Sequence, residues 1–141
     1  MITIYTDGSC IGNPGIGGWA AVIINTEKQE KIIFGKKKNT TNNQMELTAP
    51  IKALEFFSDK ENIKIFTDSK YVKEGITKWI KIWEKNGWKT SKKKMVKNID
   101  LWKKLYKLSK FHNVEWKWVK AHSNEPLNTM VDELARKAAL N

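Results

Sequence analysis

Short β-branched and aromatic runs alternate with stretches of helical period along the chain. The runs predict strands at residues 2–7, 19–24, 31–36, 63–68 and 114–119. Apolar residues at helical spacing predict helices at 42–58, 79–85, 99–110 and 131–140. A further helix is predicted to begin near Ser69 and to be interrupted at Gly75, and the glycine-rich stretch 12–18 is predicted to be a loop.

The order of these elements predicts an α/β fold with a mixed five-stranded sheet flanked by helices. Short links join the first three strands, which is typical of an antiparallel meander. The right-handed crossover rule then places the fourth strand parallel to the first. With 141 residues and no linker-like segment, the chain is predicted to be a single domain.

Two predicted strands end on the same motif, IYTDG at 4–8 and IFTDS at 65–69. Asp7 and Asp68 therefore lie at carboxyl ends of strands, where open α/β sheets bind ligands. If the strands are parallel neighbours in register, the carboxylates lie roughly 5 Å apart. Anions that close require protons or metal ions between them. Each aspartate alone is explained equally well as a cap, but the repeated lead-in favours a chemical site.

Three other residues are ambiguous by themselves. Glu46 lies on an otherwise apolar line of its predicted helix, so it is either at the rim of the core or held for chemistry. Asp132 is predicted to begin the last helix, where complementarity to the helix dipole explains an acid. His122 lies in a predicted loop and could shuttle protons, although an isolated loop histidine is more often inert.

The charge balance favours a polyanionic partner. The chain has 26 basic and 15 acidic residues, a net charge of +11, which most often indicates nucleic acid. Because 25 of the 26 basic residues are lysines, a biased base composition of the genome is an alternative explanation for the positive charge. Twelve lysines and four of the seven tryptophans, however, fall between Lys78 and Lys110. We predict that Trp79 and Trp83 form a local core and that Trp88, beyond Gly87, contacts a ligand.

Several classes of protein are disfavoured. The chain has no run of 18 apolar residues, so no membrane span is predicted, and the N-terminus does not resemble a secretory signal. Cys10 is the only cysteine, so neither an intrachain disulfide nor a cysteine-rich zinc site can form. The expected compartment is the cytoplasm.

Five motifs together resemble the bacterial type 1 ribonuclease H family. They are TDGSCIGNPG at 6–15, TTNNQMEL at 40–47, TDSKYV at 67–72, WVKAH at 118–122 and DELA at 132–135. The lysine- and tryptophan-rich stretch at about 78–98 resembles the basic protrusion of that family, which we call the handle. The resemblance extends over nearly the whole chain and implies a sheet of order 3-2-1-4-5.

The resemblance also implies roles for individual residues. Asp7, Glu46, Asp68 and Asp132 would be metal-binding carboxylates, and His122 a mobile catalytic histidine. The implied substrate contacts are Cys10, Asn13, Thr41, Asn42, Asn43, Lys70, Asn128, Trp79, Lys85, Trp88 and Lys89. Two positions depart from the family pattern, since Lys70 replaces a usual Gln or Asn and Ala121 replaces a common glycine.

The expected activity is hydrolysis of the RNA strand of RNA/DNA hybrids, giving 5′-phosphate and 3′-hydroxyl ends. Four carboxylates would be balanced by two divalent cations, and oxygen-only ligands favour Mg²⁺ or Mn²⁺. Asn13, Asn42 and Asn43 are suited to reading the 2′-hydroxyl, although asparagine also serves turns and helix starts. A monomer without an obligate protein partner is expected.

Three rival functions remain open from sequence: another metal nuclease or strand transferase on this fold, a non-catalytic hybrid-binding module, and a nucleotide-binding phosphotransferase.

Overall fold

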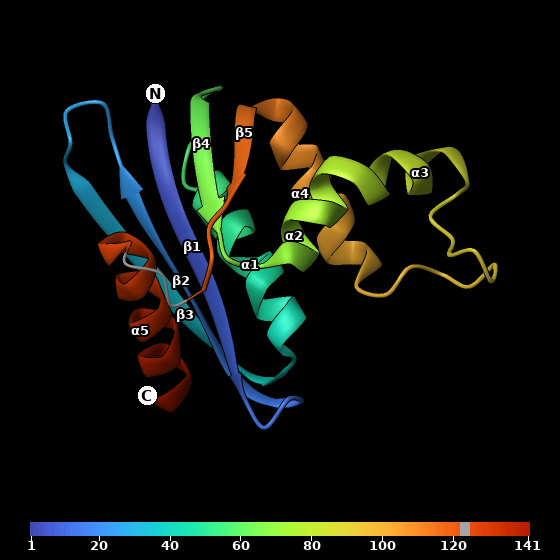
Figure 1. Cartoon of the computed structure of the whole chain (residues 1–141), viewed down its shortest axis with the longest axis horizontal. Coiled ribbons are helices and arrows are strands. Elements are labelled where there is room, and N and C mark those ends of the chain that lie inside the picture. The colour runs from blue at the N-terminus through green and yellow to red at the C-terminus, as the bar shows by residue number, and fades with distance from the viewer. Residues whose placement is uncertain (122–124) are drawn as a thin grey trace.

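The computed structural model describes residues 1–121 and 125–141. Within them, one mixed five-stranded sheet is packed by helices (Figure 1). The strands are β1 (Ile2–Ile11), β2 (Gly15–Ile24), β3 (Glu30–Thr40), β4 (Asn62–Thr67) and β5 (Asn113–Trp118). The helical segments are α1 (Asn42–Glu55), α2 (Lys70–Glu74), the π-helical η1 (Gly75–Trp79), α3 (Ile80–Lys85), α4 (Ile99–Phe111) and α5 (Pro126–Leu140).

The predicted sheet topology is confirmed. The strand order is 3-2-1-4-5, with β1 antiparallel to β2 and parallel to β4. In the β1–β4 pair Tyr5 is opposite Phe66, and their rings stack with centroids 4.6 Å apart. Thr6 is opposite Thr67, so Asp7 and Asp68 both follow directly from the last paired positions. The register therefore brings the two repeated motifs to the same edge of the sheet.

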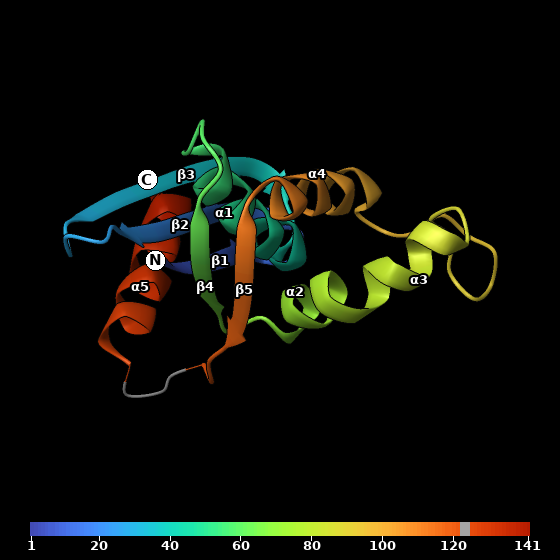
Figure 2. The same ribbon diagram turned by 90° about the horizontal axis from the view of Figure 1, so that it is seen from above.

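Helices cover both faces of the sheet. Helix α5 lies on one face, and α1 and α4 lie on the other (Figure 2). Alternation along β1 follows these layers, because Ile4 packs into the core with Leu47 and Leu105, whereas Tyr5 packs with Val131 of α5. Asp7 shares the Tyr5 face and therefore points toward the α5 side.

The predicted loop at 12–18 is wrong over its second half, because β2 begins at Gly15. A side chain at Gly18 would collide with the backbone oxygen of Ala135, so glycine here permits close packing of α5. Glycine inside a strand often marks a site where another backbone approaches closely, and in a sequence it is easily mistaken for a turn residue.

The last helix also begins earlier than predicted, at Pro126 instead of Val131. Proline is well tolerated at the first helical position, where its missing N–H is not needed. Asp132 consequently lies six residues after Pro126, beyond the first turn. The helix-dipole explanation for Asp132 is therefore wrong, because that effect fades within one turn.

The segment after Ser69 is one continuous helical run and not two helices broken at Gly75. The π-helical turn η1 shifts the phase, so Ile80 is buried while Ile82, which the predicted stripe placed inside, is 61% exposed. Gly75 is needed because a side chain there would collide with the Trp102 ring.

Trp79 and Trp83 form a local core, as predicted. Both rings pack on Trp102, with centroid distances of 6.4 and 5.5 Å.

No helix in residues 1–121 or 125–141 has the length and apolar character needed to cross a membrane.

We predict that Gly75→Ala destabilises the protein by about 1–3 kcal/mol, because the added methyl overpacks the site against Trp102. Alanine alone favours a helix by about 1 kcal/mol over glycine, so a loss would isolate the clash. Urea unfolding measures the change, with the exposed Lys81→Ala on α3 as control. Gly75→Ala protein at least as stable as wild type would contradict the packing role.

Candidate active site

Three buried or half-buried carboxylates converge where the pairing of β1 with β4 ends. The prediction that the first strand stops at Asp7 is wrong, because β1 continues along β2 as far as Ile11. Asp7 is the first β1 residue beyond the pairing with β4, Asp68 follows β4, and Glu46 comes from α1. Each offers an oxygen within 4.8 Å of the other two. Asp7 is 3% exposed and Glu46 is 7% exposed. The proximity predicted for Asp7 and Asp68 is thus present, and Glu46 joins them.

Gly8 holds this cluster together. Its backbone N–H donates to Asp7 Oδ1 at 2.9 Å and to Glu46 Oε1 at 2.5 Å. Strand β4 ends at Thr67, so this N–H donates to carboxylates instead of continuing the ladder. A side chain at Gly8 would collide with the backbone of Met45 and Glu46. The sequence interpretation treated Gly8 only as a strand end, although a small residue follows both aspartates.

Burial raises the pKa values of all three acids. The pKa of Asp7 rises to about 8, chiefly through burial, with the charges of Asp68 and Asp132 adding to the rise. Burial and the Asp7 charge raise the pKa of Glu46 well above its usual value. The pKa of Asp68 is also raised, again mainly by burial. Without a cation the cluster therefore retains protons near neutral pH.

The cluster fits a divalent cation. Asp7 Oδ2 is buried and has no hydrogen-bond partner among residues 1–121 and 125–141. A buried carboxylate oxygen is seldom left without a partner, so its lone pairs are available to an ion. The donors are all oxygen, which suits Mg²⁺ or Mn²⁺.

Asp132 stands at the edge of the cluster. Its charge raises the pKa of Asp7 and Asp68, so it is nearby, but it is not one of the three carboxylates in mutual contact. Its Oδ2 accepts a 2.7 Å bond from Arg136, the only arginine of the chain. Sequence reasoning missed Arg136, although the i,i+4 spacing signals such a pair.

Two other predicted site residues bear on this region. His122 lies outside the described residues. Asn128 is on α5, four residues before Asp132, and is only 2% exposed. That burial leaves Asn128 little surface for a direct substrate contact.

Four of the predicted substrate contacts line one cavity of about 290 Å³. Its lining includes Asn13, Thr41, Asn42, Asn43, Lys97 and Asn98, the last two not anticipated from the sequence. Asn13 Oδ1 accepts from the Asn42 N–H at 3.0 Å, and Thr41 caps α1 by accepting from the Gln44 N–H. These side chains thus also serve local structure, the alternative left open above. Cys10 is half-buried and donates to the Thr40 carbonyl.

The handle, which includes α3 and the segment that leads to α4, projects from the body (Figure 1). Lys85 and Lys89 are exposed on it. Trp88 is half-buried, with its ring 6.1 Å from Trp83 and 6.4 Å from Tyr106. Trp79 is part of the core described above. Exposed Lys70 lies instead at the start of α2, two residues after Asp68, with its ammonium over the Trp118 ring.

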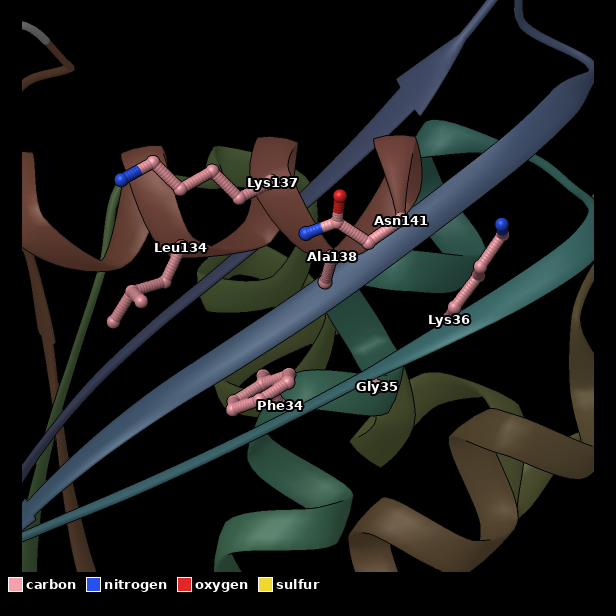
Figure 3. Close-up of a pocket in the computed structure, with 7 residues that line it drawn as sticks. All are labelled: Phe34, Gly35, Lys36, Leu134, Lys137, Ala138 and Asn141. Atoms are coloured by element: carbon pink, nitrogen blue, oxygen red, sulfur yellow. The ribbon is translucent and has the colours of Figure 1, made fainter.

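A cavity of about 360 Å³ lies apart from the carboxylate cluster, between β3 and α5 (Figure 3). Phe34, Leu134 and Ala138 form its apolar part, and Lys36 and Lys137 lie at its rim. Its lining, within the described part of the chain, includes no carboxylate side chain. The candidate catalytic site is therefore the carboxylate cluster where the β1–β4 pairing ends, and not this cavity.

Comparison with known proteins identifies the family. The family model for RNase H matches residues 1–140. The chain belongs to the ribonuclease H family. A curated ribonuclease H from Wolbachia sp. subsp. Drosophila simulans (strain wRi) is 54% identical, covering 99% of this chain and 96% of that protein. One from Francisella tularensis subsp. novicida (strain U112) is 53% identical, covering 97% and 90%. The protein is accordingly an endoribonuclease.

Solved ribonuclease H structures share its fold. The crystal structure of LC9-RNase H1, described as a type 1 RNase H with the type 2 active-site motif, is 28% identical with a TM-score of 0.87. The match covers 98% of this chain and 71% of that one. LC11-RNase H1, solved in complex with RNA/DNA hybrid, is 24% identical with a TM-score of 0.73, covering 99% and 96%.

For this ribonuclease H we predict that Asp7→Asn stabilises the protein in the absence of metal. At pH 8 its free energy of unfolding should rise by on the order of 2 kcal/mol. The substitution removes a buried charge and keeps an oxygen that accepts from the Gly8 N–H. Urea unfolding in EDTA measures it, with exposed Asp59→Asn as control. A metal-free Asp7→Asn protein less stable than wild type would argue against charge repulsion in the cluster.

The raised pKa values also predict a pH dependence. The folded-state pKa of Asp7 is about 8, whereas an ordinary aspartate has a pKa of 3.8, so the metal-free protein loses stability as pH rises between these two values. Mg²⁺ requires ionised ligands, so its stabilising effect should be larger at about pH 8 than at about pH 5.5. Melting curves with EDTA and with Mg²⁺ test this. An equal Mg²⁺ shift at both pH values would contradict binding at the buried cluster.

Proposed function

We propose that this ribonuclease H hydrolyses the RNA strand of RNA/DNA hybrids by a two-metal-ion mechanism, leaving 5′-phosphate and 3′-hydroxyl ends. The observation that carries the proposal is the buried cluster of Asp7, Glu46 and Asp68, with its raised pKa values and the unpartnered Asp7 oxygen. A module that only binds nucleic acid has no need for buried anions that repel both each other and phosphate. Family membership supports the same reaction.

Asp7, Glu46, Asp68 and Asp132 would hold the ions. Bound Mg²⁺, or Mn²⁺ in its place, supplies an activated water and stabilises charge on the leaving oxygen. Gly8 orients one oxygen each of Asp7 and Glu46 through its N–H, which leaves Asp7 Oδ2 free to bind. His122, assigned from the sequence resemblance alone, would assist proton movement or product release.

The RNA strand would lie over the asparagine cavity. Asn42 and Asn43 are exposed there, and their amides can donate to and accept from a 2′-hydroxyl, the group that distinguishes RNA from DNA. Lys97 in the same lining adds a charge for a phosphate. The hybrid complex of LC11-RNase H1, on the same fold, supports this class of substrate.

The DNA strand would lie on the handle. Lys85 and Lys89 are exposed there and suit phosphate contacts, which position a duplex without reading its sequence. The accessible part of Trp88 would pack on a sugar. We propose that the protein acts in the cytoplasm as a monomer without an obligate protein partner.

A labelled RNA/DNA hybrid, with and without Mg²⁺, tests the activity. We expect Mg²⁺-dependent cleavage of the hybrid, with little cleavage of single-stranded RNA, duplex RNA or DNA. Asp7→Asn should lower kcat by at least about 100-fold, the scale typical of groups that stabilise transition-state charge. Exposed Asp59→Asn is the matched control. Enzymatic extension of the 3′ ends and phosphatase sensitivity of the 5′ ends identify the products.

Undiminished hybrid cleavage by Asp7→Asn would rule out the assigned site. Equal cleavage of duplex RNA and hybrid would rule out the assigned substrate. Products with 3′-phosphate ends would exclude the proposed displacement.

A further inference from the structure

Trp118, the last residue of β5, makes two contacts that lead to the active site. Its indole Nε1–H donates to the backbone carbonyl of Asp68 at 3.0 Å. The ammonium of Lys70 lies 4.9 Å from the centroid of its ring. We propose that Trp118 is a positioning residue that holds the Asp68 turn in place for cation binding and holds Lys70 beside it for a phosphate of the RNA strand. The proposal rests on the function proposed above.

The first contact concerns a residue outside regular structure. Asp68 follows the end of β4 at Thr67 and precedes α2, so neither ladder nor helix fixes its carbonyl. Its neighbours are anchored, since the Val119 N–H donates to the Thr67 carbonyl at 2.9 Å and the Ser69 N–H to Thr67 Oγ1 at 3.1 Å. The indole N–H supplies the bond for Asp68 itself. Loss of that bond would let the peptide rotate and shift the Asp68 carboxylate relative to Asp7.

The second contact concerns charge. Asp7, Glu46 and Asp68 together repel a substrate phosphate, and Lys70 lies only two residues beyond Asp68. A lysine ammonium serves phosphate as a compact point charge, but its flexible stem must be held. A cation–π contact with the Trp118 ring favours one placement of the ammonium over the others that the stem allows. Trp118 is 40% exposed, so its ring is accessible to a strand that reaches Lys70.

Trp116 provides a matched control on the same strand. Its indole Nε1–H also donates one bond, at 3.2 Å, but to Ser109 Oγ on α4. A tryptophan-to-phenylalanine change at either position therefore removes one indole hydrogen bond from β5. Only the bond of Trp118 leads to a metal-binding carboxylate.

Five variants test the two contacts: Trp118→Phe, Trp118→Leu, Lys70→Met, the double variant Lys70→Met/Trp118→Leu, and the control Trp116→Phe. Mg²⁺ affinity is measured by calorimetry without nucleic acid. Hybrid affinity is measured by fluorescence anisotropy in Ca²⁺ over a range of salt concentrations, and kcat and KM on the same hybrid in Mg²⁺. Thermal melting of each variant establishes that it is folded.

Trp118→Phe keeps a ring for Lys70 and loses the N–H. It should weaken Mg²⁺ binding and lower kcat by about 3- to 10-fold, the effect of one hydrogen bond, with KM nearly unchanged. Lys70→Met should weaken hybrid binding by a similar factor and reduce the salt slope by about 1, with Mg²⁺ affinity unchanged. Trp118→Leu should show both losses, and adding Lys70→Met to it should weaken hybrid binding little further.

The proposal is overturned if Trp118→Phe and Trp116→Phe have the same Mg²⁺ affinity, or if the losses in hybrid binding from Lys70→Met and Trp118→Leu simply add. These binding readouts do not depend on cleavage. Wild-type protein that binds Mg²⁺ and hybrid but cleaves no hybrid would instead count against the proposed function.

Discussion

The close approach of helix α1 to strand β1 at Gly8 is the constraint on which the active site depends. A side chain there would collide with the backbone of Met45 and Glu46, so glycine lets the helix lie directly on the strand. One N–H then serves two acids, at 2.9 Å for Asp7 and 2.5 Å for Glu46. Because β4 has already ended, this donor is available to them. The geometry that brings Glu46 to Asp7 also excludes water from both.

Exclusion of water makes the ionised carboxylates costly to the stability of the fold and also suits them to bind a cation. Buried carboxylates with raised pKa values cost stability when they ionise, and they retain protons until a cation replaces them. The same charges repel a phosphate, yet the chain has a net charge of +11. Lysines on the handle, and Lys70 two residues after Asp68, carry positive charge that could meet a polyanionic strand. In the proposed function, metal ions and these lysines together would let one acidic site accept a nucleic acid.

Local patterns predicted much of this arrangement, and they failed where contacts between distant segments outweigh them. The repeated aspartate motif and the crossover rule predicted the β1–β4 register, because strand pairing preserves alternation. The glycines of 15–18 predict a loop, but they lie in β2, where Gly18 gives α5 room to pack. The stripe through Ile82 failed because a π turn, accommodated around Trp102, changed the helical phase.

The sequence by itself determined the parallel placement of β4 beside β1, the pairing of Asp7 with Asp68, the concentration of lysine and tryptophan in the handle and, through the motifs that resemble the family, the full strand order. Those features depend on period, spacing and residue type, which are properties of short segments. Only the tertiary structure decided that the Gly8 N–H reaches Glu46 as well as Asp7, and that Trp118 reaches Asp68. The Gly8–Glu46 and Trp118–Asp68 contacts join residues 38 and 50 positions apart, and no local pattern encodes them.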